Sequence, residues 1–234
     1  MREQHGLTIV LGASSGVGAA LLERLLVEGA PAVGFSRRAE SSFGRSLVVA
    51  DVTDRAALVG AVGGLDGPVE SVVNCVGVGF YAPWDSDGSP EWSEMAATNV
   101  AGLANVLSVV GTLAPDPENY LHVGSLAAHR PSSSPGNAVY SATKLAGRAM
   151  VNDFRNWSVS AARATRVAML SPALINGTDF DVNFFRADET ARTPLYERPY
   201  LAIEEVVDVI LRMLAMPRHL EISDLVLRHR LQED

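Results

Sequence analysis

Short apolar segments alternate along the chain with longer segments in which apolar residues recur every three or four positions. The short segments have the length of buried strands, and the longer ones have the period of helices that cover a sheet. Leu7–Leu11 is the first apolar run, and after a glycine-rich turn Val17, Leu21 and Leu25 follow at helical spacing. The alternation therefore predicts an α/β fold with a parallel sheet between helices.

The same pattern predicts each element in turn. The predicted strands are Leu7–Leu11, Pro31–Ser36, Leu47–Ala50, Val69–Val76, Tyr120–Gly124, Arg166–Leu170 and Asp224–Leu227. The predicted helices run from about Val17 to Gly29, Asp54 to Val62, Glu91 to Thr112, Ala138 to Ser160 and Ile203 to Ala215. Right-handed crossovers between such units give a doubly wound Rossmann sheet. We expect one domain over residues 1–234, with an irregular segment at 179–199.

Composition narrows the class of protein. The hydrophobic share of 47% and the charged share of 20% are ordinary for a soluble globular domain. A net charge of −8 argues against general nucleic-acid binding, which needs clustered cations. The only cysteine, Cys75, cannot form an internal disulfide and fits a reducing compartment as a buried structural thiol.

Targeting and metal signals are not found in the sequence. Residues Met1–Gly6 are polar and too short for a secretory signal, and no apolar run reaches the ~18 residues that a membrane span needs. The histidines lack metal-ligand spacing. We therefore expect a cytoplasmic protein without a membrane partner, a nucleic-acid partner or a metal site.

A glycine-rich segment follows the first predicted strand and opens the first predicted helix. Glycine permits a tight turn close to a pyrophosphate, and a helix N-terminus supplies free N–H groups and partial positive charge. An ordinary strand-to-helix turn is the alternative, but the position after an apolar strand favours a dinucleotide site. The residues expected to contact the cofactor are Gly12, Ser14, Ser15, Gly16, Val17 and Gly18.

The end of the second strand indicates which nicotinamide cofactor binds. An acidic residue there would bind the adenosine ribose hydroxyls, whereas arginine accommodates a 2′-phosphate. The segment contains Ser36, Arg37 and Arg38 but no Asp or Glu. Both arginines could be solvated turn residues, but their planar donors and their position favour NADPH/NADP+ over NADH.

Tyr140 and Lys144 are four residues apart, so that they share one face of the predicted helix. An ammonium beside a phenol favours the phenolate and lowers a pKa that is otherwise about 10, which makes tyrosine a usable acid or base. Such pairs also arise by chance on helical surfaces, where both side chains are simply solvated. Ser125, after the fifth strand, and Asn99, upstream, supply the context that favours chemistry.

Taken together, these motifs resemble the short-chain dehydrogenase/reductase family over nearly the whole chain. The G-x-x-x-G-x-G spacing, the Tyr-x-x-x-Lys pair and the segment Asn74-Cys75-Val76-Gly77 carry the resemblance. Leu11 and Ala173 depart from the family's threonine and glycine. The resemblance implies NADPH-dependent reduction of a ketone or aldehyde to an alcohol.

The resemblance also implies roles for individual residues. Tyr140 would protonate the carbonyl oxygen, and Ser125 would stabilise its developing charge. Lys144 would bind the nicotinamide ribose and tune Tyr140, while Asn99 would hold a water that relays protons. Further cofactor contacts are expected at Asp51, Val52, Asn74, Val76, Gly77, Pro172 and Ile175. Thr178 lies one residue late for the family's threonine, and its role stays open.

The substrate is less readable than the chemistry. Residues 179–199 are expected to form a lid, whose aromatic residues Phe180, Phe184, Phe185 and Tyr196 either cover a partly hydrophobic carbonyl compound or pack on the domain or a second subunit. Phe80, Tyr81 and Trp84 could line the same cavity. The Ala- and Arg-rich composition suggests, by association, a bacterial gene and a ketone of secondary metabolism.

Two other functions stay open at this point. The fold could use bound NADP(H) for a non-redox step such as epimerisation or cyclisation, or it could serve a non-catalytic, cofactor-sensing regulator, although regulators usually lose the tyrosine or the lysine. A homodimer or homotetramer, formed through the helices that carry Asn99 and Tyr140, is also expected from the resemblance.

Overall fold

The computed structural model describes residues 6–130, 136–176, 178, 180, 184 and 199–232. Within these ranges the strands form one sheet in the order β3-β2-β1-β4-β5-β6-β7, with all neighbours parallel. The strands are β1 (Leu7–Leu11), β2 (Ala32–Ser36), β3 (Val48–Val49), β4 (Val69–Asn74), β5 (Asn119–Val123), β6 (Arg166–Pro172) and β7 (Asp224–Leu227). The strand order reverses between β1 and β4, as the predicted doubly wound fold requires.

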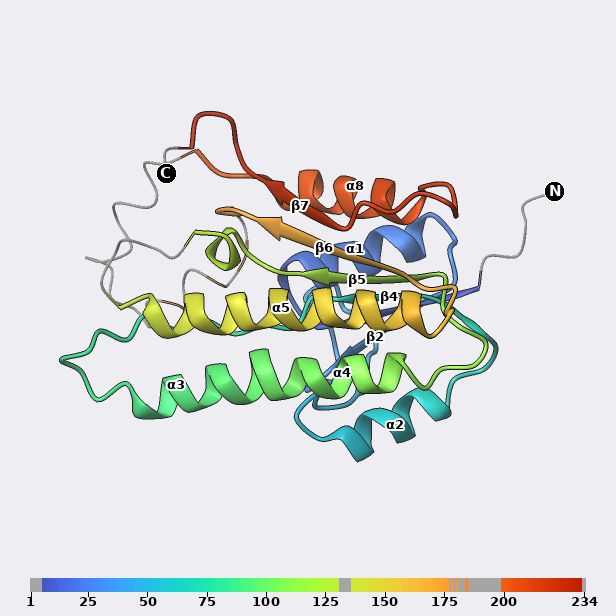
Figure 1. The fold of residues 1–234 in the computed structure, drawn as a ribbon, viewed down its shortest axis with the longest axis horizontal. Helices are drawn as coiled ribbons and strands as arrows, with labels where there is room; N and C mark the ends of the chain where they lie inside the picture. Colours follow the sequence, from blue (N-terminus) through green and yellow to red (C-terminus); the bar gives the residue numbers. More distant parts are fainter. Residues whose placement is uncertain are drawn as a thin grey trace.

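Helices cover both faces of the sheet (Figure 1). They are α1 (Gly16–Val27), α2 (Arg55–Gly63), α3 (Ser89–Ala96), α4 (Leu103–Val110), α5 (Ala138–Ser160) and α8 (Ile203–Leu214). On one face Leu58, Leu103 and Val151 bring α2, α4 and α5 into one core cluster; on the other, Leu21 and Ile210 bring α1 and α8 together. No described helix combines the length and the apolar character that crossing a membrane requires.

Two element boundaries differ from prediction for reasons visible in the structure. Strand β4 ends at Asn74 rather than Val76, because the Asn74 Oδ1 accepts a hydrogen bond from the Val76 amide at 3.0 Å and turns the chain. The helix predicted over Glu91–Thr112 is α3, a π-helical turn η1 (Ala97–Gly102) and α4 in succession. Such π turns are frequent at functional sites, and this one carries Asn99.

The parallel arrangement brings the predicted site motifs to one edge of the sheet. The glycine-rich segment follows β1, the two arginines follow β2, Asn74 ends β4, and Ser125 follows β5. In a doubly wound sheet the carboxyl edge is where ligands bind, at the reversal of strand order. The fold thus assembles residues far apart in sequence beside one crevice.

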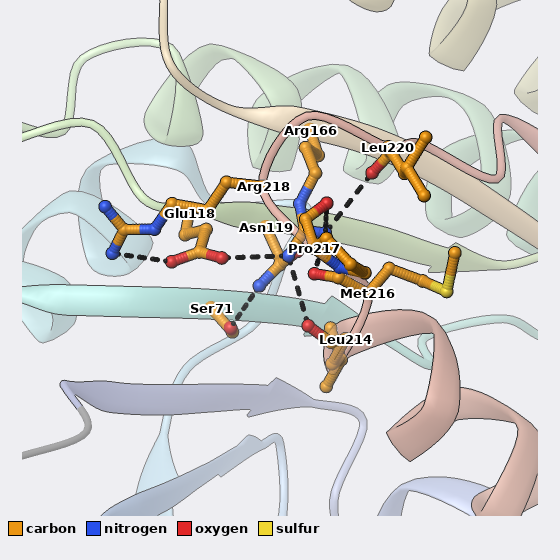
Figure 2. A network of polar contacts seen from close by, with 9 residues as sticks. All are labelled: Ser71, Glu118, Asn119, Arg166, Leu214, Met216, Pro217, Arg218 and Leu220. Atoms are coloured by element: carbon orange, nitrogen blue, oxygen red, sulfur yellow. Dashed lines mark hydrogen bonds and ion pairs between the residues drawn. The ribbon is translucent and has the colours of Figure 1, made fainter. Parts of the chain in front are cut away.

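The opposite edge of the sheet is held by Arg166, the first residue of β6 (Figure 2). Its guanidinium pairs with the Glu118 carboxylate at 2.9 Å, and Arg218 pairs with the other oxygen of that carboxylate at 3.0 Å. The same guanidinium donates to the carbonyl oxygens of Leu214, Met216, Pro217 and Leu220. One cation therefore satisfies the carbonyls at the end of α8 and in the following turn.

Arg166→Met is expected to lower the free energy of unfolding by about 3 kcal/mol, because part-buried carbonyls at the end of α8 and in the following turn lose their donor and Glu118 keeps only the exposed Arg218 as a partner. Denaturant unfolding followed by circular dichroism would measure the change. Arg218→Met is the matched control: Arg218 shares Glu118, but its side chain is 86% exposed, so a change below about 0.5 kcal/mol is expected. Equal effects from the two variants would contradict a buried anchoring role for Arg166.

Candidate active site

The glycine-rich turn between β1 and α1 has no room for side chains at its key positions. A Cβ built on Gly12, whose φ is +80°, would lie 2.9 Å from the Cys75 carbonyl carbon and the Val76 amide nitrogen. On Gly18 it would lie 2.4 Å from the Gly12 carbonyl oxygen. Strand β4 and helix α1 thus close tightly around the turn. A glycine-rich turn followed by a helix N-terminus is an arrangement in which proteins bind a pyrophosphate.

The two arginines after β2 separate in the structure. The Arg38 Nη2 lies 3.4 Å from the Ser15 Oγ at the start of α1, and the Arg38 amide donates to the Ser36 Oγ at 3.2 Å. Arg37 lies 3.9 Å from the Glu94 carboxylate on α3. Of the two arginines, only Arg38 therefore contacts the glycine-rich turn between β1 and α1, called the phosphate turn below. The sequence predicts the same cofactor contact for both arginines, because nothing in their spacing indicates that Glu94 lies near Arg37.

The segment after β4 forms the floor under Lys144. A Cβ on Gly77 would lie 2.7 Å from the Lys144 Nζ, so a larger residue there would displace the end of the lysine side chain. The side chain of Asn99 fixes the next residue: its Oδ1 accepts from the Val78 amide at 2.9 Å, and its Nδ2 donates to the Val78 carbonyl at 2.7 Å. Asn99 thus fixes the backbone at Val78, immediately after the glycine that lies next to the Lys144 ammonium.

Helix α5 supplies both Tyr140 and Lys144 in its first turns, and the Lys144 Nζ lies 5.7 Å from the centre of the Tyr140 ring. The Ser125 side chain lies beside the Tyr140 phenol and lowers the pKa of that phenol. Sequence reasoning missed Thr143, whose hydroxyl accepts from the Asn99 Nδ2 at 3.0 Å and donates to the Tyr140 carbonyl at 2.8 Å. The four predicted residues therefore meet at one point, with Thr143 joining α5 to η1.

Burial alters the acid–base properties of the pair. It raises the pKa of Tyr140 to about 12, against a lowering by the hydrogen bond from Ser125. It lowers the pKa of Lys144 to about 8, because the ammonium is desolvated. The expected lowering of the Tyr140 pKa is thus wrong in direction for this structure, since desolvation of the phenolate outweighs its favourable neighbours.

Aromatic rings cause the desolvation of Tyr140. Phe180 and Phe184 stack on each other at 5.5 Å between ring centres and lie 5.6 Å and 5.5 Å from the Tyr140 ring. Gly79 permits this, because a Cβ there would meet all three rings at 2.9 Å or less. The two phenylalanine rings, Phe180 and Phe184, are called the aromatic cover below. The Tyr81 amide donates to the Phe184 carbonyl at 2.7 Å and thereby joins this cover to the segment after β4.

The remaining lid and pocket predictions divide into three groups. Phe185 and Tyr196 lie outside the described residues, as does most of 179–199. Phe80 is buried beside this region. Trp84 is 70% exposed and packs on Trp92, with ring centres 5.5 Å apart, so the structure gives no support for its lining the cavity.

The segment after β6 approaches the phosphate turn. A Cβ built on Gly16 would lie 3.6 Å from the Cγ2 of Thr178, so this threonine lies over the turn although its sequence position is late. Ile175 forms a parallel bridge with Leu201, but the bridge uses the Asn176 amide and the Leu174 carbonyl. The bridge therefore uses neither the amide nor the carbonyl of Ile175.

Two further predicted contacts lie at the rim of the crevice. The Asp51 carboxylate accepts from the Thr53 amide and hydroxyl, both at 2.9 Å, and the Val52 carbonyl accepts from Asn105 on α4 at 2.9 Å. These bonds fix the end of β3 against α4. Among the residues that the structure describes, no cluster of histidine, cysteine or carboxylate side chains is suited to a metal ion.

Comparison with known proteins is consistent with this geometry. Residues 7–189 match the model of the short chain dehydrogenase family. The chain belongs to this family. Its oxidoreductase class, predicted from the motifs, is thereby confirmed.

Relatives of this short-chain dehydrogenase are similar along nearly their whole length. A serine 3-dehydrogenase of Rhizobium radiobacter is 30% identical over 95% of the chain and 93% of its own length. An NADP-dependent 3-hydroxy acid dehydrogenase of Escherichia coli K12 is 26% identical, over 94% and 93%. A solved serine dehydrogenase in complex with NADP+, in a closed form, superposes with a TM-score of 0.82 at 25% identity, covering 94% of each chain. The NADP(H) prediction agrees with these relatives.

Lys144 is the only lysine in the sequence, which makes its ionisation directly measurable. Labelling with isotopic lysine gives one side-chain resonance, and its titration is expected near the value of about 8 that burial produces. A titration near 10 would mean that the ammonium is solvated and would contradict the buried position.

Lys144→Met is expected to be more stable than the wild type at pH 7, by an amount on the order of 2 kcal/mol, because it removes the cost of burying a charged amine. Between about pH 8 and 10.5 the folded wild type binds fewer protons than the unfolded chain, so its stability rises with pH and the advantage of the variant shrinks. Calorimetry at pH 7 and pH 10 measures both values. A gap that widens with pH would overturn the sign.

Proposed function

We propose that the protein catalyses the reversible NADPH-dependent reduction of a carbonyl compound to an alcohol, with Tyr140 as the proton donor. The observation that carries the proposal is the convergence on Tyr140: the Ser125 hydroxyl lies beside its phenol, and the Lys144 Nζ lies 5.7 Å from the centre of its ring. The convergence occurs beside the phosphate turn. A proton donor and a cofactor site thus share one crevice.

The residues present fit an NADP(H) cofactor. The narrow glycine turn and the N-terminus of α1 would hold the pyrophosphate, while Arg38 with Ser15 and Ser36 would hold the 2′-phosphate. The Ile175 backbone and Thr178 would face the nicotinamide end. When bound, NADPH supplies the hydride. The names of the relatives, NADP-dependent in one case and complexed with NADP+ in another, support the same choice.

Each side chain then has one task at the carbonyl. Ser125 donates a hydrogen bond to the carbonyl oxygen and stabilises the charge that develops there. Tyr140 delivers the proton to that oxygen, and the Lys144 ammonium stabilises the phenolate that is left. The Asn99 amide is occupied by Val78 and Thr143, so a relay water at Asn99 would bind its backbone. The same groups serve the reverse oxidation.

The aromatic cover supports an apolar group next to the carbonyl. Phe180, Phe184 and Gly79 form an apolar wall on the Tyr140 ring, and a flat hydrocarbon group could replace the partly exposed Phe180 ring there. The relatives act, by name, on serine and 3-hydroxy acids. We infer that this chain prefers an aryl or alkyl ketone. Secondary metabolism, a cytoplasmic location and homo-oligomerisation stay predictions.

Tyr140→Phe is expected to lower kcat by roughly 10³-fold, because the donor is lost while the ring and its packing stay. The assay follows NADPH oxidation with acetophenone and with 3-oxobutanoate, and the reverse reaction with L-serine. Phe80→Tyr, a ring change outside the proposed chemistry, is the matched control.

Full activity of Tyr140→Phe in a clean preparation would sink the proposed role of Tyr140. Turnover without net consumption of NADPH would favour the non-redox alternative. A preference for 3-oxobutanoate over acetophenone would contradict the inferred preference for an apolar substrate but not the proposed carbonyl reduction.

Arg38→Ala is expected to weaken NADPH binding by roughly 20-fold, because charge-assisted bonds to the 2′-phosphate are lost, and to leave NADH binding unchanged. Arg37→Ala, which breaks only the contact with Glu94, is the matched control and should change NADPH affinity by less than about threefold. Fluorescence titration with both cofactors measures the four constants. Equal losses from the two variants would contradict the separate assignment of the arginines.

A further inference from the structure

A histidine next to the Ser125 turn connects three other elements. His129 ends the 3₁₀ helix η2 (Leu126–Ala128), and its Nε2 lies 3.0 Å from the Ser171 Oγ on β6 and 3.5 Å from the Asp224 Oδ1 on β7. The other carboxylate oxygen of Asp224 accepts from the Arg148 Nε on α5 at 2.7 Å. Arg148 lies one turn after Lys144 on the same helix. The cluster therefore joins η2 and α5 to β6 and β7.

The cluster contains serine, histidine and aspartate, but its geometry is not that of a hydrolytic relay. Such a relay uses both ring nitrogens of histidine, one toward the serine and one toward the carboxylate. Here Nε2 faces both partners. Ser171 is also fully buried, so no substrate reaches its hydroxyl. The contact of His129 with Ser171 therefore serves to hold η2 next to β6, and we call it a tether below.

The charges around His129 determine its form. Burial holds the pKa of His129 below its usual range, with Asp224 raising it and Arg148 lowering it, so the ring is neutral at neutral pH. Asp224 from β7 and Arg148 from α5 are the charged groups that face it, and Ser171 from β6 is uncharged. Nε2 makes a hydrogen bond with the Ser171 Oγ, while the Asp224 Oδ1 lies 3.5 Å away and, among the described residues, accepts no hydrogen bond.

The tether acts on a short and tightly held segment. Ser125 begins η2 by accepting from the Ala127 amide at 3.1 Å, and His129 ends it four residues later. Beside it, a Cβ on Gly124 would lie 3.2 Å from the Ser171 Oγ and closer still to Met169. Ser171 in turn directly precedes Pro172. A shift of His129 therefore tilts η2 and moves the Ser125 hydroxyl.

We propose that His129 is a positioning residue for the carbonyl chemistry: through its hydrogen bond with Ser171, with Asp224 beside the ring, it holds the Ser125 turn against β6, and thereby sets where the Ser125 hydroxyl meets Tyr140. The inference rests on the proposed function, because it assigns His129 an effect on the hydrogen bond that Ser125 makes there. His129 touches neither the phosphate turn nor Tyr140, and its effect on the reaction passes through Ser125.

Two amide variants separate the nitrogens of the ring. His129→Gln keeps a donor near the position of Nε2, whereas His129→Asn keeps one only near Nδ1 and falls short of Ser171 and Asp224. Both are polar and of moderate size. His219→Asn, at an exposed histidine after α8, is the matched control. Circular dichroism and thermal unfolding verify that each variant is folded.

The first readout needs no substrate. In protein labelled at the tyrosine Cζ, the Tyr140 resonance is assigned by its loss in Tyr140→Phe and reports the hydrogen bond from Ser125. We expect His129→Asn to shift it in the direction that Ser125→Ala does, with no further shift in the double variant, and His129→Gln to resemble the wild type. An unmoved resonance in His129→Asn, or equal shifts from the Gln and Asn variants, would overturn the proposal.

The second readout is turnover of acetophenone with NADPH. His129→Asn is expected to lower kcat about tenfold with the KM for NADPH within about twofold, and to have no effect in a Ser125→Ala background, as a residue that acts through Ser125 must. An equal loss in both backgrounds refutes action through Ser125. If no carbonyl compound is reduced by the wild type, the proposed function fails, and the resonance experiment still decides the position of Ser125.

Discussion

The buried ammonium of Lys144 is the interaction on which the site's architecture depends. A charged amine taken out of water is costly unless its surroundings are built around it. Gly77 leaves space for the Nζ, since a Cβ there would lie 2.7 Å from it and displace the end of the side chain, and Asn99 fixes the chain just beyond through Val78. The π turn that carries Asn99 and the helix that carries Tyr140 meet at the same point. Removing any of these would leave the charge either crowded or unsupported.

The fold and most site positions could be predicted because they follow from local patterns. Apolar runs and helical spacing were enough for the doubly wound sheet, and parallel strands bring the segments after β1, β2, β4 and β5 to one edge. The choice of Tyr140 and Lys144 as a site rested on context and on the family resemblance, but their shared helical face followed from helical period. These inferences need only the order of residues along one element, so errors were confined to boundaries such as the end of β4.

Contacts between distant segments could not be predicted in the same way. The pairing of Arg37 with Glu94 joins β2 to α3, and the bond from Asn99 to Thr143 joins η1 to α5. The rise in the Tyr140 pKa comes from Phe180 and Phe184, far along the chain. Each depends on packing distances between elements, which spacing in one sequence does not encode. The sequence was therefore enough to predict which residues form the site, but not how their surroundings change their pKa values.

The amino-terminal and carboxyl-terminal ends of the parallel strands have different roles. Arg166 and its carbonyl partners anchor the amino-terminal edge, where β6 begins, whereas the reactive groups lie on the segments that follow the carboxyl ends. Changes in the loops of the reactive edge thus need not disturb the anchor.

The presence of a single, buried lysine gives the protein an unusual chemical identity. Every other cationic side chain apart from histidine is arginine, which amine-directed reagents do not modify. Acylating or reductively alkylating reagents can therefore react at the chain's α-amino group and at one side chain, the amine in the crevice. Loss of activity on acylation, and its prevention by a bound ligand, would report on a single nitrogen atom. Coupling the protein to a support through surface amines has correspondingly little to attach to, and thiol or carboxyl chemistry would be the sounder route for immobilisation.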